Sequence, residues 1–128
     1  MRLLLDTQVF LWSLDAPERL SRGAAAAILD RAGELFLSAA SYWEICLKLS
    51  IGRLALREDW PEVLDREMTA NRIVWLPLER HHLRGIIELP WLHRDPFDRL
   101  LVAQARCEGL TLVTADEHIP AYPVDTLW

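Results

Sequence analysis

The chain has 128 residues, a hydrophobic fraction of 52% and a formal net charge of -5. The length is typical of one domain, the apolar content excludes a disordered chain, and the longest stretch without a charged residue, nine residues at 35–43, is too short to span a bilayer. The acidic balance argues against a passive nucleic-acid coat but not against an enzyme that handles phosphates through bound cations.

The cysteines and the N-terminus indicate the compartment. Cys46 and Cys107 lie on predicted apolar helix faces, so we expect buried free thiols, which suit a reducing cytoplasm. The N-terminal residues lack the layout of a secretory signal. We therefore expect a cytoplasmic protein with a single domain over residues 1–128 and no membrane segment.

Apolar patterning predicts strands and helices in alternation. In chain order, the expected elements are a strand at 2–6, helices at 7–14 and 22–31, a strand at 35–38, helices at 39–51 and 59–70, a strand at 73–76, helices at 79–88 and 96–108, and strands at 110–114 and 123–127. The leucine run of the first strand is typical of a parallel strand covered on both faces. This order predicts an α/β fold with three α/β/α layers and a mostly parallel central sheet.

The start of the helix at 96–108 carries two acidic residues. Asp95 is a good N-cap, and Pro96 suits the first helical position, where its missing N–H costs nothing. Asp98 falls in the first turn, beside free backbone N–H groups that favour an anion. Taken alone, this pattern is that of an ordinary helix start.

Acidic side chains fall on four segments that a parallel sheet brings to one edge. Asp6 ends the first strand and Asp116 follows the strand at 110–114, so both lie at carboxyl ends of strands, where ligands bind in such folds. The helix before that strand starts on the same edge and carries Asp98. Glu44 lies about a turn and a half into the helix after the strand at 35–38. We expect the four carboxylates to share one rim.

Each of these acids also has a structural explanation. Asp6 and Asp116 suit turns or caps, and Glu44 suits an i,i+4 surface pair with Lys48. Their convergence is harder to explain in this way, because clustered carboxylates raise each other's pKa unless a cation neutralises them. Oxygen ligands of this kind suit Mg²⁺ or Mn²⁺.

The histidines do not indicate a zinc site, because none has the ligand spacing of one. His81 and His82 are interpreted as a solvated helix face. His93 and His118 are interpreted as isolated side chains. The sequence therefore predicts an acidic metal centre.

Four stretches around the acidic residues carry a family resemblance: LLLDT at 3–7, SAASYWEI at 38–45, HRDPFDR at 93–99 and LVTAD at 112–116. They resemble the four acidic motifs of PIN domains and, more closely, those of VapC-type toxins from bacterial toxin–antitoxin pairs. The resemblance covers essentially the whole chain in order, and the third stretch is its most specific part.

This resemblance implies a PIN-like fold and a Mg²⁺- or Mn²⁺-dependent endoribonuclease. It implies that the catalytic and metal-binding quartet is Asp6, Glu44, Asp98 and Asp116. It also implies a cognate antitoxin of VapB type that blocks the site, and a toxin homodimer. Asp95 matches a recurrent position, and Gln8 departs from the histidine that many members carry there.

The expected reaction is hydrolysis of an RNA phosphodiester bond. One or two metals held by Asp6, Asp98 and Asp116 would bind the phosphate and lower the pKa of a water. Glu44 would complete the site or orient that water as a base. In-line attack would leave a 5′-phosphate and a 3′-hydroxyl.

Further residues are predicted to contact the substrate or to form the core. Arg94 and Arg99 flank the acidic helix start and could either contact the RNA backbone or simply be solvated. Thr114 could either hydrogen-bond a phosphate or a metal-bound water, or cap the end of its strand. Four tryptophans are expected in the core: Trp12, Trp43, Trp60 and Trp75. Trp91 and Trp128 are expected at the surface, where they suit a partner or a base stack.

Three other function classes have different sequence requirements. A receiver domain needs paired acids after the first strand and a lysine near the last, whereas this chain has a lone Asp6 and its only lysine is Lys48. An aspartyl phosphatase needs Asp-x-Asp, which Asp6-Thr7-Gln8 does not provide. A catalytically silent binding module, whose acidic rim docks a basic partner protein, stays open as the alternative.

Overall fold

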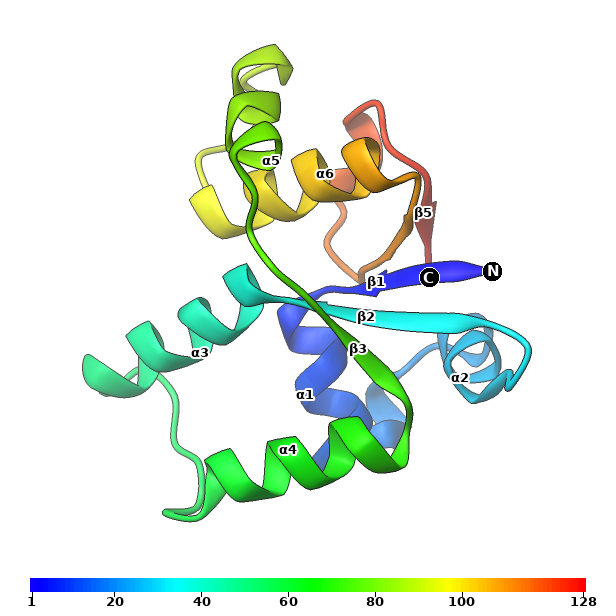
Figure 1. Ribbon diagram of the computed structural model, residues 1–128, viewed down its shortest axis with the longest axis vertical. Helices are drawn as coiled ribbons and strands as arrows, with labels where there is room; N and C mark the ends of the chain where they lie inside the picture. The colour runs from blue at the N-terminus through cyan, green and yellow to red at the C-terminus, as the bar shows by residue number, and fades with distance from the viewer.

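A single parallel sheet organises the computed structural model, which describes residues 1–128 (Figure 1). Its five strands, in the order β3-β2-β1-β4-β5, are β3 (Ile73–Leu76), β2 (Glu34–Ser38), β1 (Arg2–Leu5), β4 (Thr111–Val113) and β5 (Thr126–Leu127). The central strand β1 pairs with β2 from Arg2 opposite Glu34 and with β4 from Leu3 opposite Thr111. The predicted three-layer fold is confirmed, and every strand pair is parallel.

Two buried clusters, one on each face of the sheet, form the core. The helices are α1 (Thr7–Asp15), α2 (Arg22–Leu29), α3 (Ala39–Ser50), α4 (Trp60–Ala70), α5 (Arg80–Gly85) and α6 (Pro96–Glu108). Figure 1 shows α5 and α6 on one side of the sheet and α1, α2 and α4 on the other. Because side chains alternate along a strand, Leu4 of β1 joins the cluster under α6, whereas Leu3 and Leu5 join the other.

Helix starts at the carboxyl edge of the sheet are fixed by side-chain caps. The Asp6 carboxylate accepts a hydrogen bond from the backbone N–H of Gln8 at 2.8 Å and begins α1. Ser38 Oγ accepts one from Ala40 at 2.9 Å and begins α3. Asp95 caps α6 in the same way. Asp6 and Ser38 stand where strands end and helices begin, whereas Asp95 caps α6 after a loop, and the three helix N-termini lie at this edge.

His82 corrects the prediction of a solvated histidine pair. His81 is exposed, but His82 is only 1% exposed. Its Nδ1 accepts a hydrogen bond from the backbone N–H of Glu79 at 3.0 Å, and its Nε2 lies 2.7 Å from Oε1 of Glu108 on α6. The Glu79-x-x-His82 spacing was a capping signal that the charge pattern obscured. This histidine ties α5 to α6.

The cysteine and tryptophan predictions also need correction. Both cysteines are free, as expected, but both are exposed. Trp43 is 53% exposed because α3 projects beyond the sheet, and Trp75 is 46% exposed because β3 is an edge strand. Among the helices of this structure, none combines the length and the apolar character that a membrane crossing requires.

The contact between His82 and Glu108 predicts a pH-dependent contribution to stability. The hydrogen bond from His82 lowers the pKa of Glu108 below its ordinary value of 4.5. An acid whose pKa is lowered on folding stabilises the folded protein at pH values above its ordinary pKa. This stabilisation is lost as the pH falls through the folded-state pKa. We expect Glu108→Gln to reduce the free energy of unfolding at pH 7 by about 0.5–1 kcal/mol in urea titrations.

The exposed Glu88 supplies the matched control, Glu88→Gln. As pH is lowered from 7 to 3, the difference in unfolding urea concentration between the unmodified protein and Glu108→Gln should shrink. A deficit of Glu108→Gln that stays constant over this range, or an equal deficit in Glu88→Gln at pH 7, would contradict the assignment.

Candidate functional site

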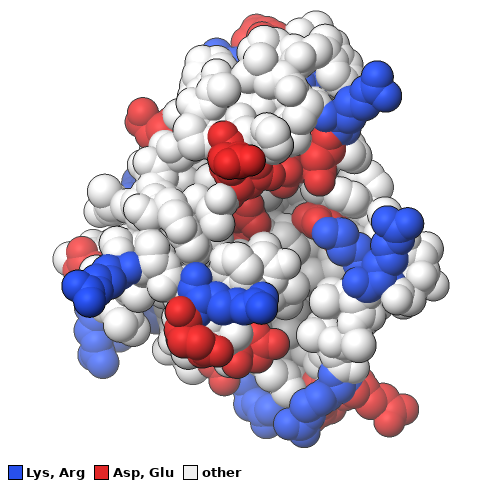
Figure 2. Space-filling model, turned by 180° about the vertical axis from the view of Figure 1, so that it is seen from behind, with Lys and Arg blue, Asp and Glu red and all other residues white.

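All four predicted carboxylates line one cavity of about 420 Å³ at the carboxyl edge of the sheet. They come from the end of β1, the second turn of α3, the first turn of α6 and the loop after β4: Asp6, Glu44, Asp98 and Asp116. Figure 2 looks onto a hollowed face in which acidic side chains gather, with basic side chains on its rim. The predicted convergence of the four carboxylates is therefore present in the structure.

Thr114 links the carboxylate of Asp6 to the backbone of Asp116. Its hydroxyl, on a residue only 3% exposed, donates a hydrogen bond to Asp6 Oδ2 at 2.8 Å and accepts one from the backbone N–H of Asp116 at 3.0 Å. The side chain is not part of the cavity lining. Thr114 thus fixes Asp6 and the backbone of Asp116, which agrees with the strand-end cap, one of the two roles that the sequence suggested beside a contact with phosphate or a metal-bound water.

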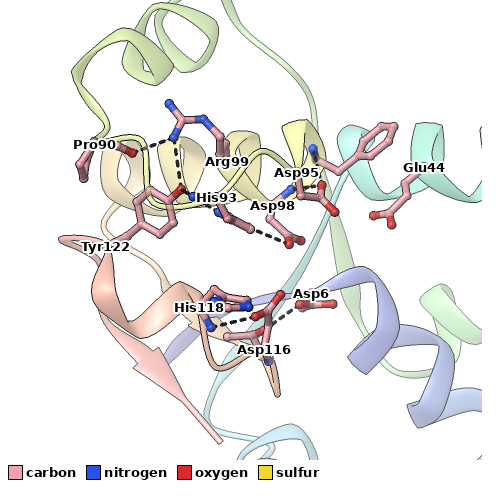
Figure 3. Close-up of polar contacts among 12 residues, drawn as sticks. Asp6, Glu44, Pro90, His93, Asp95, Asp98, Arg99, Asp116, His118 and Tyr122 are labelled. Carbon is pink, nitrogen blue, oxygen red and sulfur yellow. Dashed lines mark hydrogen bonds and ion pairs between the residues drawn. The ribbon is translucent and has the colours of Figure 1, made fainter.

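Asp98 lies at the centre of the site, close to two other carboxylates and to a histidine. Figure 3 shows its carboxylate between Asp6 and Asp116 on one side and His93 on the other. His93 Nε2 lies 3.2 Å from Asp98 Oδ2, and one ligand atom each from His93, Asp98 and Asp116 lie within 4.8 Å of one another. The prediction of an isolated His93 is wrong, because the loop before α6 folds back over the helix start.

Glu44 enters the cavity from α3. It is 7% exposed, and its Oε2 lies 2.5 Å from the Nζ of Lys48. The i,i+4 pair expected from the spacing is present, but it stands at the cavity and not on an open surface. Lys48 and Arg53 both line the cavity and were not predicted as site residues. Lys48 could have been found from its spacing to Glu44, whereas Arg53 gave no local signal.

Arg94 and Arg99, the two predicted RNA contacts, differ in exposure. Arg94 is exposed. Arg99 is 3% exposed, and its Nη1 donates hydrogen bonds to the Pro90 carbonyl at 2.7 Å and to the Tyr122 hydroxyl at 3.2 Å. This burial does not support the predicted contact of Arg99 with RNA. Its guanidinium satisfies a carbonyl and a hydroxyl that would otherwise be buried without partners.

The crowded acids carry an electrostatic cost. Burial raises the pKa of Asp98 to about 8, and the neighbouring Asp95, Asp6, Asp116 and Glu44 add to the shift. Burial also raises the pKa of Asp6, although hydrogen bonds from Thr114 and Gln8 oppose this. A divalent cation among these oxygens would remove the repulsion, and carboxylate oxygens are ligands that hard cations prefer. The residues present therefore fit a divalent metal.

Comparison with known proteins decides the family. The model of the PIN domain matches residues 3–124. The chain belongs to the PIN domain family. A curated relative, Ribonuclease VapC22 of Mycobacterium tuberculosis, is 30% identical over 98% of this chain and 98% of its own length, which places this PIN domain with the VapC-type proteins.

Solved structures show that the PIN fold is shared over nearly the whole chain. VapBC2 from Rickettsia felis, bound to a DNA fragment from its promoter, contains a chain with a TM-score of 0.76 and 17% identity, covering 99% of this chain and 98% of that one. FitAcB from Neisseria gonorrhoeae has a TM-score of 0.59 and 22% identity, covering 98% and 96%. The predicted family and fold are confirmed.

The raised pKa of Asp98 predicts how the metal-free protein responds to pH. An acid whose folded-state pKa lies above its ordinary value of 3.8 destabilises the fold progressively as pH rises from there to about 8. In the presence of EDTA, we expect Asp98→Asn to raise the free energy of unfolding at pH 8 by more than about 1.4 kcal/mol, the equivalent of one pKa unit. At pH 4 the gain should be small.

Thermal and urea unfolding at the two pH values measure this difference. Asp65→Asn, on the exposed face of α4, serves as the control and should change neither curve. An Asp98→Asn variant that is destabilised at pH 8 in EDTA would show that Asp98 is not under net repulsion.

Proposed function

We propose that this PIN domain is a Mg²⁺- or Mn²⁺-dependent endoribonuclease that acts as the toxin of a toxin–antitoxin pair. One observation carries the proposal: carboxylates from four separate segments line a single cavity, where burial, with the neighbouring acids adding to it, raises the pKa of Asp98 to about 8. Burying and crowding carboxylates lowers the stability of a fold. A bound cation offsets that cost, so such a cluster is typical of a cation site. Kinship with Ribonuclease VapC22 supports RNA as the substrate.

Asp6, Asp98 and Asp116 are the residues that would hold the metal, with Glu44 completing the set. When bound, the cation supplies positive charge to the scissile phosphate and promotes ionisation of the attacking water. The protein's own contribution is to hold the ligands in place: Thr114 and the N–H of Gln8 engage both oxygens of Asp6 before any cation arrives.

Glu44 is suited to orient the attacking water and accept its proton. It is buried, faces the cavity and is held by Lys48, so its carboxylate has a fixed position. Lys48 and Arg53 at the cavity, with the exposed Arg94, would contact RNA phosphates. Hydrolysis by in-line attack would leave a 5′-phosphate and a 3′-hydroxyl.

The partners of this proposal follow from the related structures. The names VapBC2 and VapBC-1 of two related solved structures join VapB to VapC. We infer a cognate antitoxin of VapB type that covers the acidic cavity. We also infer that the chain folds as a single domain and forms a homodimer. The cytoplasm is the expected compartment, where exposed free thiols such as Cys46 and Cys107 stay reduced.

Cleavage of an RNA panel tests the proposal. With Mn²⁺ present, we expect cleavage that EDTA abolishes and that Asp98→Asn reduces at least about a hundredfold, or about 2.7 kcal/mol in the barrier. Asp65→Asn, on the exposed face of α4, should cleave normally. If Asp98→Asn cleaves like the unmodified protein, the catalytic assignment is wrong. Partner binding without cleavage by any form would instead favour the silent binding module.

A further inference from the structure

We propose that His93 is a positioning residue of the acidic site: its Nε2–H fixes the Asp98 carboxylate for cation binding, and Tyr122 with Arg99 sets the direction of that hydrogen bond. This inference rests on the proposed function, because the cation is part of it. The three residues lie on one side of Asp98, away from Glu44 (Figure 3).

His93 spans the distance between the acidic cavity and a buried tyrosine. It belongs to the loop between the short helix η2 (Ile86–Glu88) and α6, and its side chain is 15% exposed. Its Nε2 lies 3.2 Å from Asp98 Oδ2, and its Nδ1 lies 2.7 Å from the Tyr122 hydroxyl. The imidazole therefore has one partner on each ring nitrogen.

The hydroxyl of Tyr122 determines which ring nitrogen carries the proton. Tyr122 is 3% exposed, and its oxygen accepts hydrogen bonds from Arg99 Nη1 at 3.2 Å and from the backbone N–H of His93 at 3.3 Å. Both partners are donors without an acceptor lone pair. The tyrosine's own O–H is left to donate to His93 Nδ1, so Nε2 bears a proton and donates it to Asp98.

Arg99 keeps this direction fixed. An arginine stays protonated in proteins, so it always donates to Tyr122. Its Nη1 also donates to the Pro90 carbonyl at 2.7 Å, and its Cζ lies 4.0 Å from the ring centroid of Trp91. The 79% exposed Trp91 thus covers the guanidinium, and its exposure on the surface has a local explanation.

The geometry favours positioning of Asp98 over direct ligation by His93. Although His93 lies near Asp98 and Asp116, its Nε2 is committed as a donor, and the residue is not part of the cavity lining. A hydrogen bond to Oδ2 holds the carboxylate against repulsion by Asp6 and Asp116 and leaves Oδ1 for a cation. Carboxylates that bind metals are commonly oriented by such outer partners, whose loss costs 10- to 100-fold in affinity.

Calorimetric titration of Mn²⁺ into the chelator-treated protein, without RNA, tests this assignment. We expect His93→Leu to weaken Mn²⁺ binding about 10- to 100-fold. His93→Gln keeps an N–H at similar reach and should bind within about threefold of the unmodified protein, while Tyr122→Phe should fall between the two. His118→Leu is the matched control: the ring centroids of His118 and His93 lie 6.0 Å apart, and the hydrogen bond from His118 to Asp116 Oδ1 comes from the backbone N–H, which leucine keeps.

Each outcome separates the two proposals. No Mn²⁺ binding by the unmodified protein would overturn the metal site and this inference together. Normal binding by His93→Leu would overturn the inference alone, and so would equal losses in His93→Leu and His93→Gln, which would make His93 a ligand. Long-range ¹H–¹⁵N NMR of the unmodified, metal-free protein, recorded above pH 8 where Asp98 is ionised, provides a test that does not depend on whether a variant folds. A proton on Nε2 is expected, and a proton on Nδ1 alone would refute the relay.

Discussion

Repulsion among buried carboxylates is the constraint on which the rest of the structure depends. Four acidic side chains share a cavity at the carboxyl edge of the sheet, and burial raises the pKa of Asp98 to about 8. The parallel topology creates this meeting, because strand ends and helix starts coincide at that edge. Capping and hydrogen bonds from Gln8, Thr114 and His93 then keep the carboxylates from separating.

The sequence revealed which carboxylates meet because their positions follow from the sheet topology. A parallel sheet sends Asp6, Asp98 and Asp116 to one edge whatever the details of the loops. Burial of polar residues was less predictable. His82 and Arg99 looked like surface residues in the pattern, yet each is buried because it meets a specific partner from a distant segment, Glu108 and Tyr122 respectively. Such pairings depend on tertiary contacts that periodicity does not encode.

The loop before α6 illustrates the same limit within the most specific motif. His93, Asp95 and Asp98 are close in sequence, and the capping role of Asp95 followed from its place before Pro96. The role of His93 did not, since it requires Tyr122, whose hydroxyl meets the ring from near the other end of the chain. A single stretch of sequence thus supplies a helix cap, a carboxylate of the acidic cavity and a histidine whose ring nitrogen contacts that carboxylate.

A crystal structure of the protein soaked with Mn²⁺ would test the central claim most directly. The account predicts an anomalous difference peak within the acidic cavity, within about 2.4 Å of carboxylate oxygens of Asp98 and Asp116, with Asp6 in its coordination sphere directly or through a water. Mn²⁺ bound only elsewhere, or a soaked crystal with no anomalous peak among these carboxylates, would contradict it.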